Sequence, residues 1–180
     1  MSGRWRTWGM PMMLPLVARA LRRGFCGVWL NRGEFPPAAA AGRPLLVCAS
    51  HTNWWDGFVA AFVWSRCAGG RRFALMQERK HLEKYPFFKL AGVFGIDLDG
   101  SPVGGLREAL RRLADPRCML WMFPQGEFRG PEEPVRLRPG AALLARRSNA
   151  LLLPFWLHYE WLFESRPAVI VEAGEPLEPE

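Results

Sequence analysis

The sequence has few cysteines and no long apolar run, and each of these absences excludes a class of protein. The four cysteines of the 180-residue chain lie 22, 19 and 51 residues apart, so no Cys-x-x-Cys pair or zinc-ligand spacing exists. A disulfide framework is therefore not expected, and a reducing compartment is favoured. The longest charge-free run near the start, residues 7–18, has 12 residues and two prolines. It is shorter than the roughly 20 apolar residues of a spanning helix and lacks a signal-peptide cleavage site.

Lysine and tyrosine are also scarce, whereas arginine and tryptophan are abundant. Arginine supplies 21 of the 24 basic residues, the formal net charge is +7, and nine tryptophans accompany two tyrosines. A basic, tryptophan-rich surface suits nucleic acid or the anionic face of a bilayer. The sequence has no RNP, zinc-finger or helix-turn-helix pattern, so we do not expect nucleic-acid binding. Hydrophobic residues make up 49% and charged residues 23%, which are ordinary proportions for one globular domain.

Residues 1–33 predict an N-terminal amphipathic helical segment that precedes the main domain. Between Trp5 and Leu30, arginines are mixed with tryptophan, leucine and other apolar side chains. We expect this segment to lie in a membrane interface with its apolar face in the acyl boundary; the alternative is a helix packed on the core of the domain itself. A Pro/Ala/Gly linker over residues 34–44 follows, and the main domain is predicted over residues 44–180.

The main domain alternates between short apolar runs and longer amphipathic stretches. The apolar runs predict strands over residues 45–49, 73–76, 93–98, 118–123, 151–157 and 168–172. The longer stretches predict helices over residues 54–66, 78–90, 103–114 and 140–147. The second is expected to be interrupted or to start afresh near Pro86, and the third to be capped by Ser101 with Pro102 in its first turn. This alternation indicates an α/β fold, a single layered domain whose mixed, mostly parallel sheet is flanked by helices.

A histidine and an aspartate follow the first predicted strand. His51 and Asp56 are five residues apart, a spacing that would separate them by about 140° on a regular helix. If His51 ends the strand and Asp56 lies in the first helical turn, the chain folds back and the carboxylate can orient the imidazole as a base. The alternative is structural, with Asn53 capping the helix and Asp56 as its partner in a capping box.

Three further blocks accompany this pair in the order of a known family. They are Gly-Val-Phe-Gly-Ile-Asp at residues 92–97, Phe-Pro-Gln-Gly-Glu-Phe-Arg-Gly at residues 123–130 and Leu-Leu-Pro-Phe at residues 152–155. With His-x4-Asp counted as the first block, residues 123–130 are the third, and the turn in this third block is expected to face the same sheet edge as His51. Together with His-x4-Asp, the blocks resemble the glycerolipid, or lysophospholipid, acyltransferases over residues 44–158.

This resemblance implies a fold like that of the glycerol-3-phosphate acyltransferases and an enzyme of phospholipid or related lipid metabolism. Such an enzyme moves an acyl group from acyl-CoA or acyl carrier protein to a hydroxyl of a lipid acceptor, as a peripheral, monotopic protein on the cytoplasmic face of the membrane. It implies His51 as the general base and Asp56 as its orienting partner, with no cofactor and no metal. The residues implied to bind substrate are Ile96, Asp97, Gln125, Gly126, Glu127 and Arg129. We expect the backbone N–H groups after His51 to stabilise the oxyanion.

Several positions depart from the pattern of the family. Its second block usually has an arginine where this chain has Leu98, and its third block has Glu, Thr and Arg at the positions of Gln125, Glu127 and Phe128. Leucine cannot replace the bidentate bonds of an arginine to phosphate. We therefore expect an acceptor without a phosphomonoester, such as a glycolipid or a glycosylated carotenoid. The alternatives are a 1-acylglycerol-3-phosphate acyltransferase, with Arg129, Arg136 or Arg138 in the vacant role, and a catalytically silent lipid-binding relative.

Other polar residues have simpler interpretations. His81 lies in a polar stretch and is expected to face solvent, and His158 follows a predicted strand without a motif around it. The adjacent pairs Arg71-Arg72 and Arg146-Arg147 predict a solvated face, with head groups or the phosphates of coenzyme A as alternative ligands.

Overall fold

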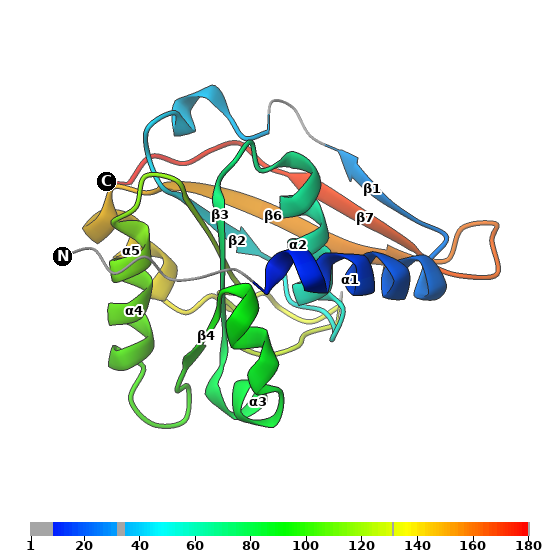
Figure 1. The fold of residues 1–180 in the computed structure, drawn as a ribbon, viewed down its shortest axis with the longest axis horizontal. Coiled ribbons are helices and arrows are strands. Elements are labelled where there is room, and N and C mark those ends of the chain that lie inside the picture. Colours follow the sequence, from blue (N-terminus) through cyan, green and yellow to red (C-terminus); the bar gives the residue numbers. More distant parts are fainter. Residues whose placement is uncertain (1–8, 32–34, 131, 180) are drawn as a thin grey trace.

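A mostly parallel, seven-stranded sheet forms the middle of the molecule (Figure 1). The computed structural model describes residues 9–31, 35–130 and 132–179. Across the sheet the order is β1-β7-β6-β2-β5-β3-β4, and of these neighbouring pairs β6 with β7 is antiparallel and the others are parallel. The strands are β1 (Gly27–Asn31), β2 (Leu45–Ala49), β3 (Arg72–Glu78), β4 (Val93–Ile96), β5 (Cys118–Met122), β6 (Leu151–Glu160) and β7 (Ala168–Ala173).

Helices cover both faces of this sheet, in agreement with the predicted α/β class. On one face α1 and α2 pack against each other, whereas α4 and α5 lie together on the opposite face (Figure 1). The described helices are α1 (Met10–Gly24), α2 (Asp56–Cys67), α3 (Arg79–Lys84), α4 (Val103–Leu113) and α5 (Gly140–Ser148), with the 3-10 turns η1 (Ala38–Ala40) and η2 (Pro86–Ala91).

The central strands have apolar side chains on both faces and therefore contribute to two cores. Leu45 and Val47 of β2 enter the core under α1 and α2, while Leu46 between them enters the core under α4 and α5. All five residues of β5 are buried. A strand covered on both faces is a continuous apolar run in the sequence, which is why β2 and β5 could be predicted from the sequence.

Three local predictions differ from the structure. Residues 27–31, expected within the helical segment, form β1, an edge strand that pairs with β7 near the far end of the chain. The helix predicted over residues 78–90 does break at Pro86 as expected, but it starts one residue later because β3 extends to Glu78, and its second part is the 3-10 turn η2. The N-cap of α4 is Pro102 and has no side-chain cap, so Ser101 does not have the expected capping role.

The N-terminal helix has one buried and one exposed face. Met10, Val17 and Leu21 of α1 are buried in the core, whereas Met12 and Leu16 are exposed. The helix thus packs on the domain and still presents apolar side chains outward; its membrane contact and the domain boundary at residue 33 stay predictions. Residues 5–8 of the predicted segment lie outside the described residues. Of the helices that the structure describes, none is long and apolar enough to cross a membrane.

Candidate active site

The chain folds back between β2 and α2 and brings a histidine onto an aspartate. His51 follows the end of β2, and its Nδ1 lies 2.8 Å from Oδ2 of Asp56, the first residue of α2. The same Oδ2 accepts the N–H groups of Thr52 at 2.7 Å and Asn53 at 3.0 Å. Asn53 Oδ1 in turn accepts the N–H of Trp55 at 2.8 Å, an Asx-type turn, whereas the N-cap of α2 is Trp55 and has no side-chain cap. One carboxylate therefore closes the turn and also contacts the imidazole, as both interpretations of the sequence require of Asp56, and the catalytic role of the pair stays a prediction.

The carboxylate of Asp56 is completely buried and has a donor on each oxygen. Its second oxygen, Oδ1, accepts the hydroxyl of Tyr159 on β6 at 2.6 Å. Burial first, and the adjacent Asp56 charge second, raise the pKa of Tyr159 well above its ordinary value, so its hydroxyl keeps its hydrogen and donates it. A carboxylate beside Nδ1 favours the tautomer with hydrogen on that nitrogen, which leaves Nε2 free to accept a proton.

Tyr159 is a site residue that the sequence analysis missed. It lies 103 residues from Asp56, and it reaches the site because β6 runs parallel to β2 and continues past its end. Ser50 secures this extension: its hydroxyl donates to the carbonyl of Leu157 at 3.1 Å and accepts the N–H of Leu157 at 2.8 Å. A lone tyrosine after a strand gives no local signal, so only the strand order reveals its role.

The turn after β5 fixes the backbone of His51, as expected from the parallel pairing of β2 with β5. The side-chain oxygen of Gln125 accepts the His51 N–H at 2.5 Å, and the Arg129 N–H donates to the His51 carbonyl at 2.9 Å. Phe123 stacks on the imidazole with ring centres 4.2 Å apart, and Phe128 covers it with centres 4.3 Å apart. The first and third blocks therefore form one structure around the histidine.

Gly126 in this turn has a backbone conformation that other residues rarely adopt. Its φ is +74°, and a Cβ there would lie 2.6 Å from Nε of Arg138. The glycine thus allows the guanidinium of Arg138 to lie against the turn.

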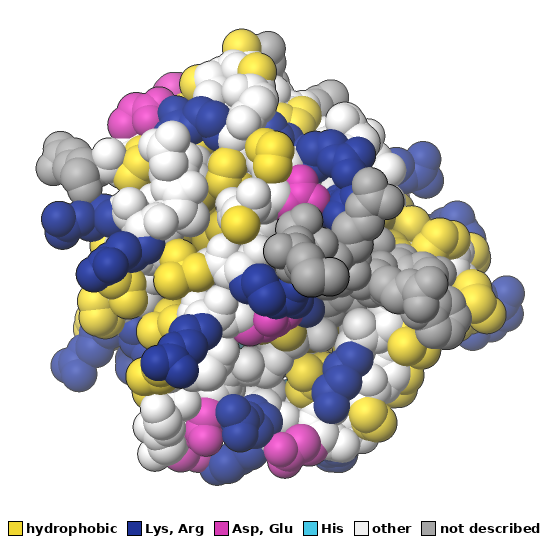
Figure 2. Space-filling view, turned by 60° about the vertical axis from the view of Figure 1, so that its left-hand side comes forward, with side chains coloured by type: hydrophobic (Ala, Val, Ile, Leu, Met, Phe, Trp, Pro, Cys, Tyr) yellow, Lys and Arg dark blue, Asp and Glu magenta, His cyan; other side chains and the backbone are white. Residues whose placement is uncertain are grey.

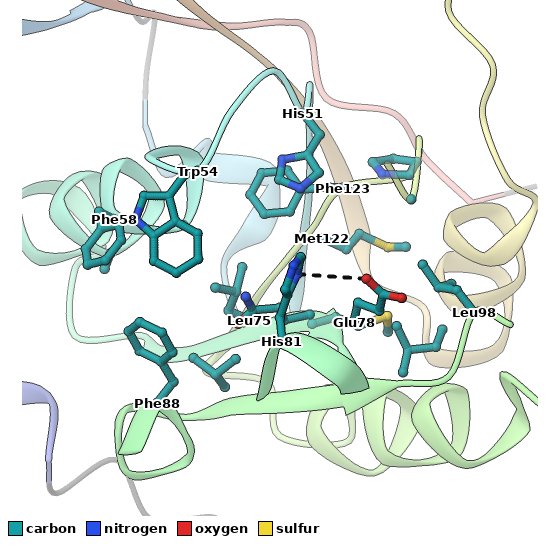
Figure 3. Close-up of a pocket in the computed structure, with 18 of the residues that line it drawn as sticks. His51, Trp54, Phe58, Leu75, Glu78, His81, Phe88, Leu98, Met122 and Phe123 are labelled. Atoms are coloured by element: carbon teal, nitrogen blue, oxygen red, sulfur yellow. Dashed lines mark ion pairs between the residues drawn. The ribbon is translucent and has the colours of Figure 1, made fainter. Parts of the chain in front are cut away.

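An apolar cavity of about 430 Å³ lies beside the His51 ring (Figure 3). Trp54 lies just before α2, Phe58 lies in its first turn, and Leu75 and Phe88 come from β3 and η2. Three side chains of α1 line the same cavity: Met10, Met13 and Val17. Its size and apolar lining fit a hydrocarbon chain or a small lipid portion.

The cavity lining includes more acidic side chains than arginines, and two of the acidic ones are paired with cations, Asp99 with Lys80 and Glu127 with Arg129. Glu78, Asp99 and Glu127 are its acidic side chains, and Arg138 is its arginine. His81 also lines the cavity, 3.8 Å from Glu78, and Figure 3 shows it across the cavity from His51. His81 is thus partly exposed, with 42% of its side chain accessible, and it also lines the cavity.

The structure brings only part of the predicted substrate-binding set to the cavity. Ile96, Gly126 and Glu127 line it, whereas Gln125 is buried and holds the backbone of His51. The other two residues of that set, Asp97 and Arg129, bind other parts of the chain.

Asp97 and Arg129 are these two residues, and neither is among those lining the cavity. Asp97 accepts the N–H of Gly100 at 2.9 Å. Arg129 pairs with Glu127 and with Glu133, the latter at 3.2 Å, and 19% of its side chain is exposed. Of the arginines considered as replacements for the missing family arginine, Arg138 lines the cavity and Arg129 does not.

The expected oxyanion donors are already engaged. The N–H groups of Thr52 and Asn53, which directly follow His51, both donate to Asp56. These two N–H groups support the Asp56 carboxylate and are not free for a substrate oxygen, so an oxyanion role for the backbone after His51 stays a prediction that excludes them.

The site contains no serine or cysteine arranged as a nucleophile among its described residues. The Ser50 hydroxyl is bonded to the backbone of β6, and the nearest thiol in sequence is Cys48. Burial raises the pKa of Cys48, and likewise that of Cys118, to about 12, so both stay as unreactive thiols.

The two arginine pairs differ in role. Arg71 donates to the carbonyls of Arg43, at 2.8 Å, and Ala40, and Arg72 forms a salt bridge of 3.0 Å with Asp115, so this pair stabilises loops. Arg146 and Arg147 are exposed to solvent in the last turn of α5. Figure 2 shows Lys and Arg side chains spread over the face with α4 and α5, separated by hydrophobic ones, rather than gathered in one patch.

A family comparison agrees with this geometry. The family model described as Acyltransferase matches residues 30–158, which include all four sequence blocks and both members of the His51–Asp56 pair. The chain belongs to the Acyltransferase family, and the prediction of an O-acyltransferase enzyme of lipid metabolism is confirmed. A comparison with curated proteins finds no match.

The fold is similar to that of a solved bacterial enzyme. The crystal structure of the 1-acyl-sn-glycerophosphate (LPA) acyltransferase PlsC from Thermotoga maritima superposes with a TM-score of 0.64 at 17% sequence identity. The match covers 94% of this chain and 69% of that protein. At this identity the likeness establishes the shared α/β fold and confirms the predicted class.

Proposed function

We propose that this enzyme transfers an acyl group from a thioester, acyl-CoA or acyl carrier protein, to a hydroxyl of a lipid acceptor. The observation that carries the proposal is the His51–Asp56 contact of 2.8 Å beside an apolar cavity of about 430 Å³. A base next to a hydrocarbon-sized cavity is the arrangement that acylation of a lipid requires. The family assignment supports the same reaction class.

His51 acts as the general base in this proposal. Its Nε2 takes the proton of the acceptor hydroxyl while the oxygen attacks the thioester carbonyl carbon. The tetrahedral intermediate then breaks the carbon–sulfur bond, and the imidazolium returns the proton to the departing thiolate. Asp56 keeps Nδ1 protonated and stabilises the imidazolium, while Phe123 and Phe128 restrict the rotation of the ring. The products are an ester and a free thiol, with no covalent intermediate on the enzyme.

The acyl chain occupies the apolar part of the cavity in this proposal. Met10 and Met13 of α1 and Phe88 of η2 supply flexible or aromatic surfaces against which methylene groups can pack. Because α1 forms one wall, the same helix contributes to chain binding and exposes Met12 and Leu16 on its outer side. This supports our further proposal that the enzyme works peripherally at the cytoplasmic face of a membrane.

The charge of the cavity favours an acceptor without a phosphomonoester. A phosphomonoester carries nearly two negative charges, and its burial requires several paired cations. The cavity offers Arg138 together with three acidic side chains, and Leu98 lines it where the family usually has arginine. Carboxylates accept hydrogen bonds from sugar hydroxyls. We therefore propose a neutral hydroxyl, for instance on a sugar attached to a lipid.

A 1-acylglycerol-3-phosphate acceptor is the alternative, because the structurally similar Thermotoga maritima protein is described as an enzyme for that substrate. The deciding step for either acceptor is to detect transfer. Full-length protein is incubated with acyl-CoA and a membrane lipid extract, and acylated products are identified by mass spectrometry.

His51→Ala should abolish the product, a loss of about 10²- to 10⁴-fold for a missing base. His158→Gln is the matched control, since His158 pairs with Glu160 outside the cavity and should keep full activity. Transfer by His51→Ala at the wild-type rate would contradict the assignment of His51 as the base. Absence of transfer by the wild type would instead favour the catalytically silent, lipid-binding alternative.

A further inference from the structure

The loop between β6 and β7 presents three consecutive large apolar side chains to the outside. Trp161 is 71% exposed, Phe163 is fully exposed at 106%, and Leu162 between them is 46% exposed. We call residues 161–163 the hairpin tip. Monomeric proteins rarely expose adjacent large apolar residues without a partner. The arrangement therefore requires an explanation that the acyl-transfer site does not give.

The hairpin tip lies beside the arginine-rich end of α1. The Arg166 guanidinium donates to the carbonyl of Arg22, and the N–H of Cys26 donates to the carbonyl of Pro167 at 3.0 Å. Figure 1 shows the loop projecting past the C-terminal end of α1, away from α4 and α5. Two segments more than a hundred residues apart in sequence thus share one end of the molecule.

The charge around the hairpin tip is predominantly positive. Arg19, Arg22 and Arg23 are exposed on the last turns of α1, and Arg166 follows the tip. The acidic side chains nearest in sequence are Glu160, which pairs with His158 at 3.3 Å, and the exposed Glu164. Four guanidinium groups against two carboxylates leave an excess of positive charge.

We propose that the hairpin tip inserts into the interface of an anionic lipid bilayer, while the arginines at the end of α1 and Arg166 contact the head groups. Tryptophan and phenylalanine favour this depth of the bilayer, and arginine adds electrostatic attraction to anionic lipid. Met12 and Leu16, 72% and 68% exposed on the outer face of α1, provide a second apolar contact. A bilayer is favoured over a protein partner because the apolar tip matches the acyl region of the membrane and the basic residues beside it match the anionic head groups.

The proposal rests on the proposed function only in that a lipid acceptor is reached from a membrane surface. Two contacts, the outer face of α1 and the hairpin tip, fix an orientation, whereas one contact would leave the molecule free to pivot about it. The hairpin tip is thus an anchoring surface distinct from the cavity beside His51, because residues 161–163 are not among those that line the cavity.

Vesicle flotation with the full chain tests the hairpin tip. Wild type and the double variant Trp161→Gln/Phe163→Gln are compared on phosphatidylcholine vesicles with and without phosphatidylglycerol. We expect at least tenfold weaker partitioning of the variant onto the anionic vesicles, because each lost apolar side chain removes more than a tenfold factor when fully buried. The control is Leu143→Gln, which removes a 42% exposed apolar side chain from α5 on the opposite end of the molecule.

Two outcomes overturn the proposal: partitioning of the double variant equal to wild type, or an equal loss in Leu143→Gln. A wild-type dimer that becomes monomeric in the double variant, with unchanged partitioning, would identify a second copy as the occupant. Arg22→Gln/Arg23→Gln should weaken binding to anionic vesicles only. His51→Ala should partition onto vesicles like wild type, and the hairpin variant should still acylate an acceptor dispersed in detergent. A failure of the membrane-anchoring proposal can therefore be distinguished from a failure of the acyl-transfer proposal.

Discussion

Tyr159 and His51 bind opposite oxygens of one buried carboxylate. Tyr159 donates to Oδ1 of Asp56 at 2.6 Å, and His51 Nδ1 lies 2.8 Å from Oδ2. The aspartate therefore cannot rotate about its terminal bond without losing one of them. Its orientation depends on strand β6, a part of the chain distant in sequence from the His-x4-Asp motif, so the His51–Asp56 contact depends on the assembled sheet.

Tyr159→Phe tests this dependence. The change leaves a buried carboxylate oxygen without its donor, which should lower the free energy of unfolding by about 1–3 kcal/mol. We expect kcat to fall by about tenfold with little change in KM, because the ring of His51 loses orientation and the substrate loses no contact. The kinetic measurement is repeated in an Asp56→Asn background, where Tyr159→Phe should have almost no further effect. Additive losses in the double variant would show that Tyr159 acts independently of Asp56.

Gln125 offers a test with two matched substitutions. Its side-chain oxygen accepts the His51 N–H at 2.5 Å, and either an amide or a carboxylate can provide that acceptor. Gln125→Glu should therefore retain most activity, whereas Gln125→Leu should lose about tenfold or more in kcat and destabilise the fold by about 1–3 kcal/mol. Equal activity of both variants would mean that this hydrogen bond does not position His51. Steady-state kinetics and urea unfolding provide the two readouts.

The buried thiols predict how stability changes at alkaline pH. The pKa of both Cys48 and Cys118 is raised from 9.0 to about 12 by burial. In the unfolded chain these thiols lose their protons above about pH 9, whereas in the folded chain they keep them until about pH 12. The unfolded state therefore binds fewer protons in this window, and the free energy of unfolding falls as pH rises.

Urea unfolding at pH 8 and pH 10 measures this effect. Each thiol should contribute a decrease on the order of 1 kcal/mol between the two values. The double variant Cys48→Ala/Cys118→Ala should have a smaller pH dependence than wild type, although its stability at pH 8 is lower because two buried side chains become smaller. Identical pH slopes in the two proteins would contradict the assignment of the alkaline loss to these thiols.

The sheet and the contact between His51 and Asp56 could be predicted from the sequence because both have local patterns. β2 and β5 are short apolar runs, and His51 and Asp56 are separated by one turn-forming segment. β1 was missed because its mixture of glycine, tryptophan and asparagine becomes a strand only through pairing with β7. Structure that depends on contacts between distant segments has no such local pattern.

The acceptor-binding residues illustrate the same limit. The sequence could not distinguish Arg129 from Arg138, because both follow the third block within a loop. In the structure, Glu127 and Glu133 hold Arg129, while the left-handed Gly126 lets Arg138 approach the turn. These interactions depend on backbone conformation and on partners in three dimensions.

The acceptor itself gives the last prediction. Leu98 lines the cavity at the position where the family usually has an arginine, and the remaining cavity charges are mainly acidic. In a competition between lysophosphatidic acid and a neutral glycolipid at equal concentration, with one acyl-CoA, we expect faster acylation of the glycolipid. Glycerol 3-phosphate should not be a substrate.

Leu98→Arg should shift this preference toward lysophosphatidic acid by about tenfold, because a charge-assisted bond to phosphate is worth more than about 1.4 kcal/mol. Leu98→Met, which keeps the size and the apolar character, is the control and should leave the ratio of products unchanged. The ratio is measured by mass spectrometry of the mixed reaction. Preference of the wild type for lysophosphatidic acid would contradict the neutral acceptor, and Arg138→Gln would then test whether Arg138 is the cation that binds its phosphate.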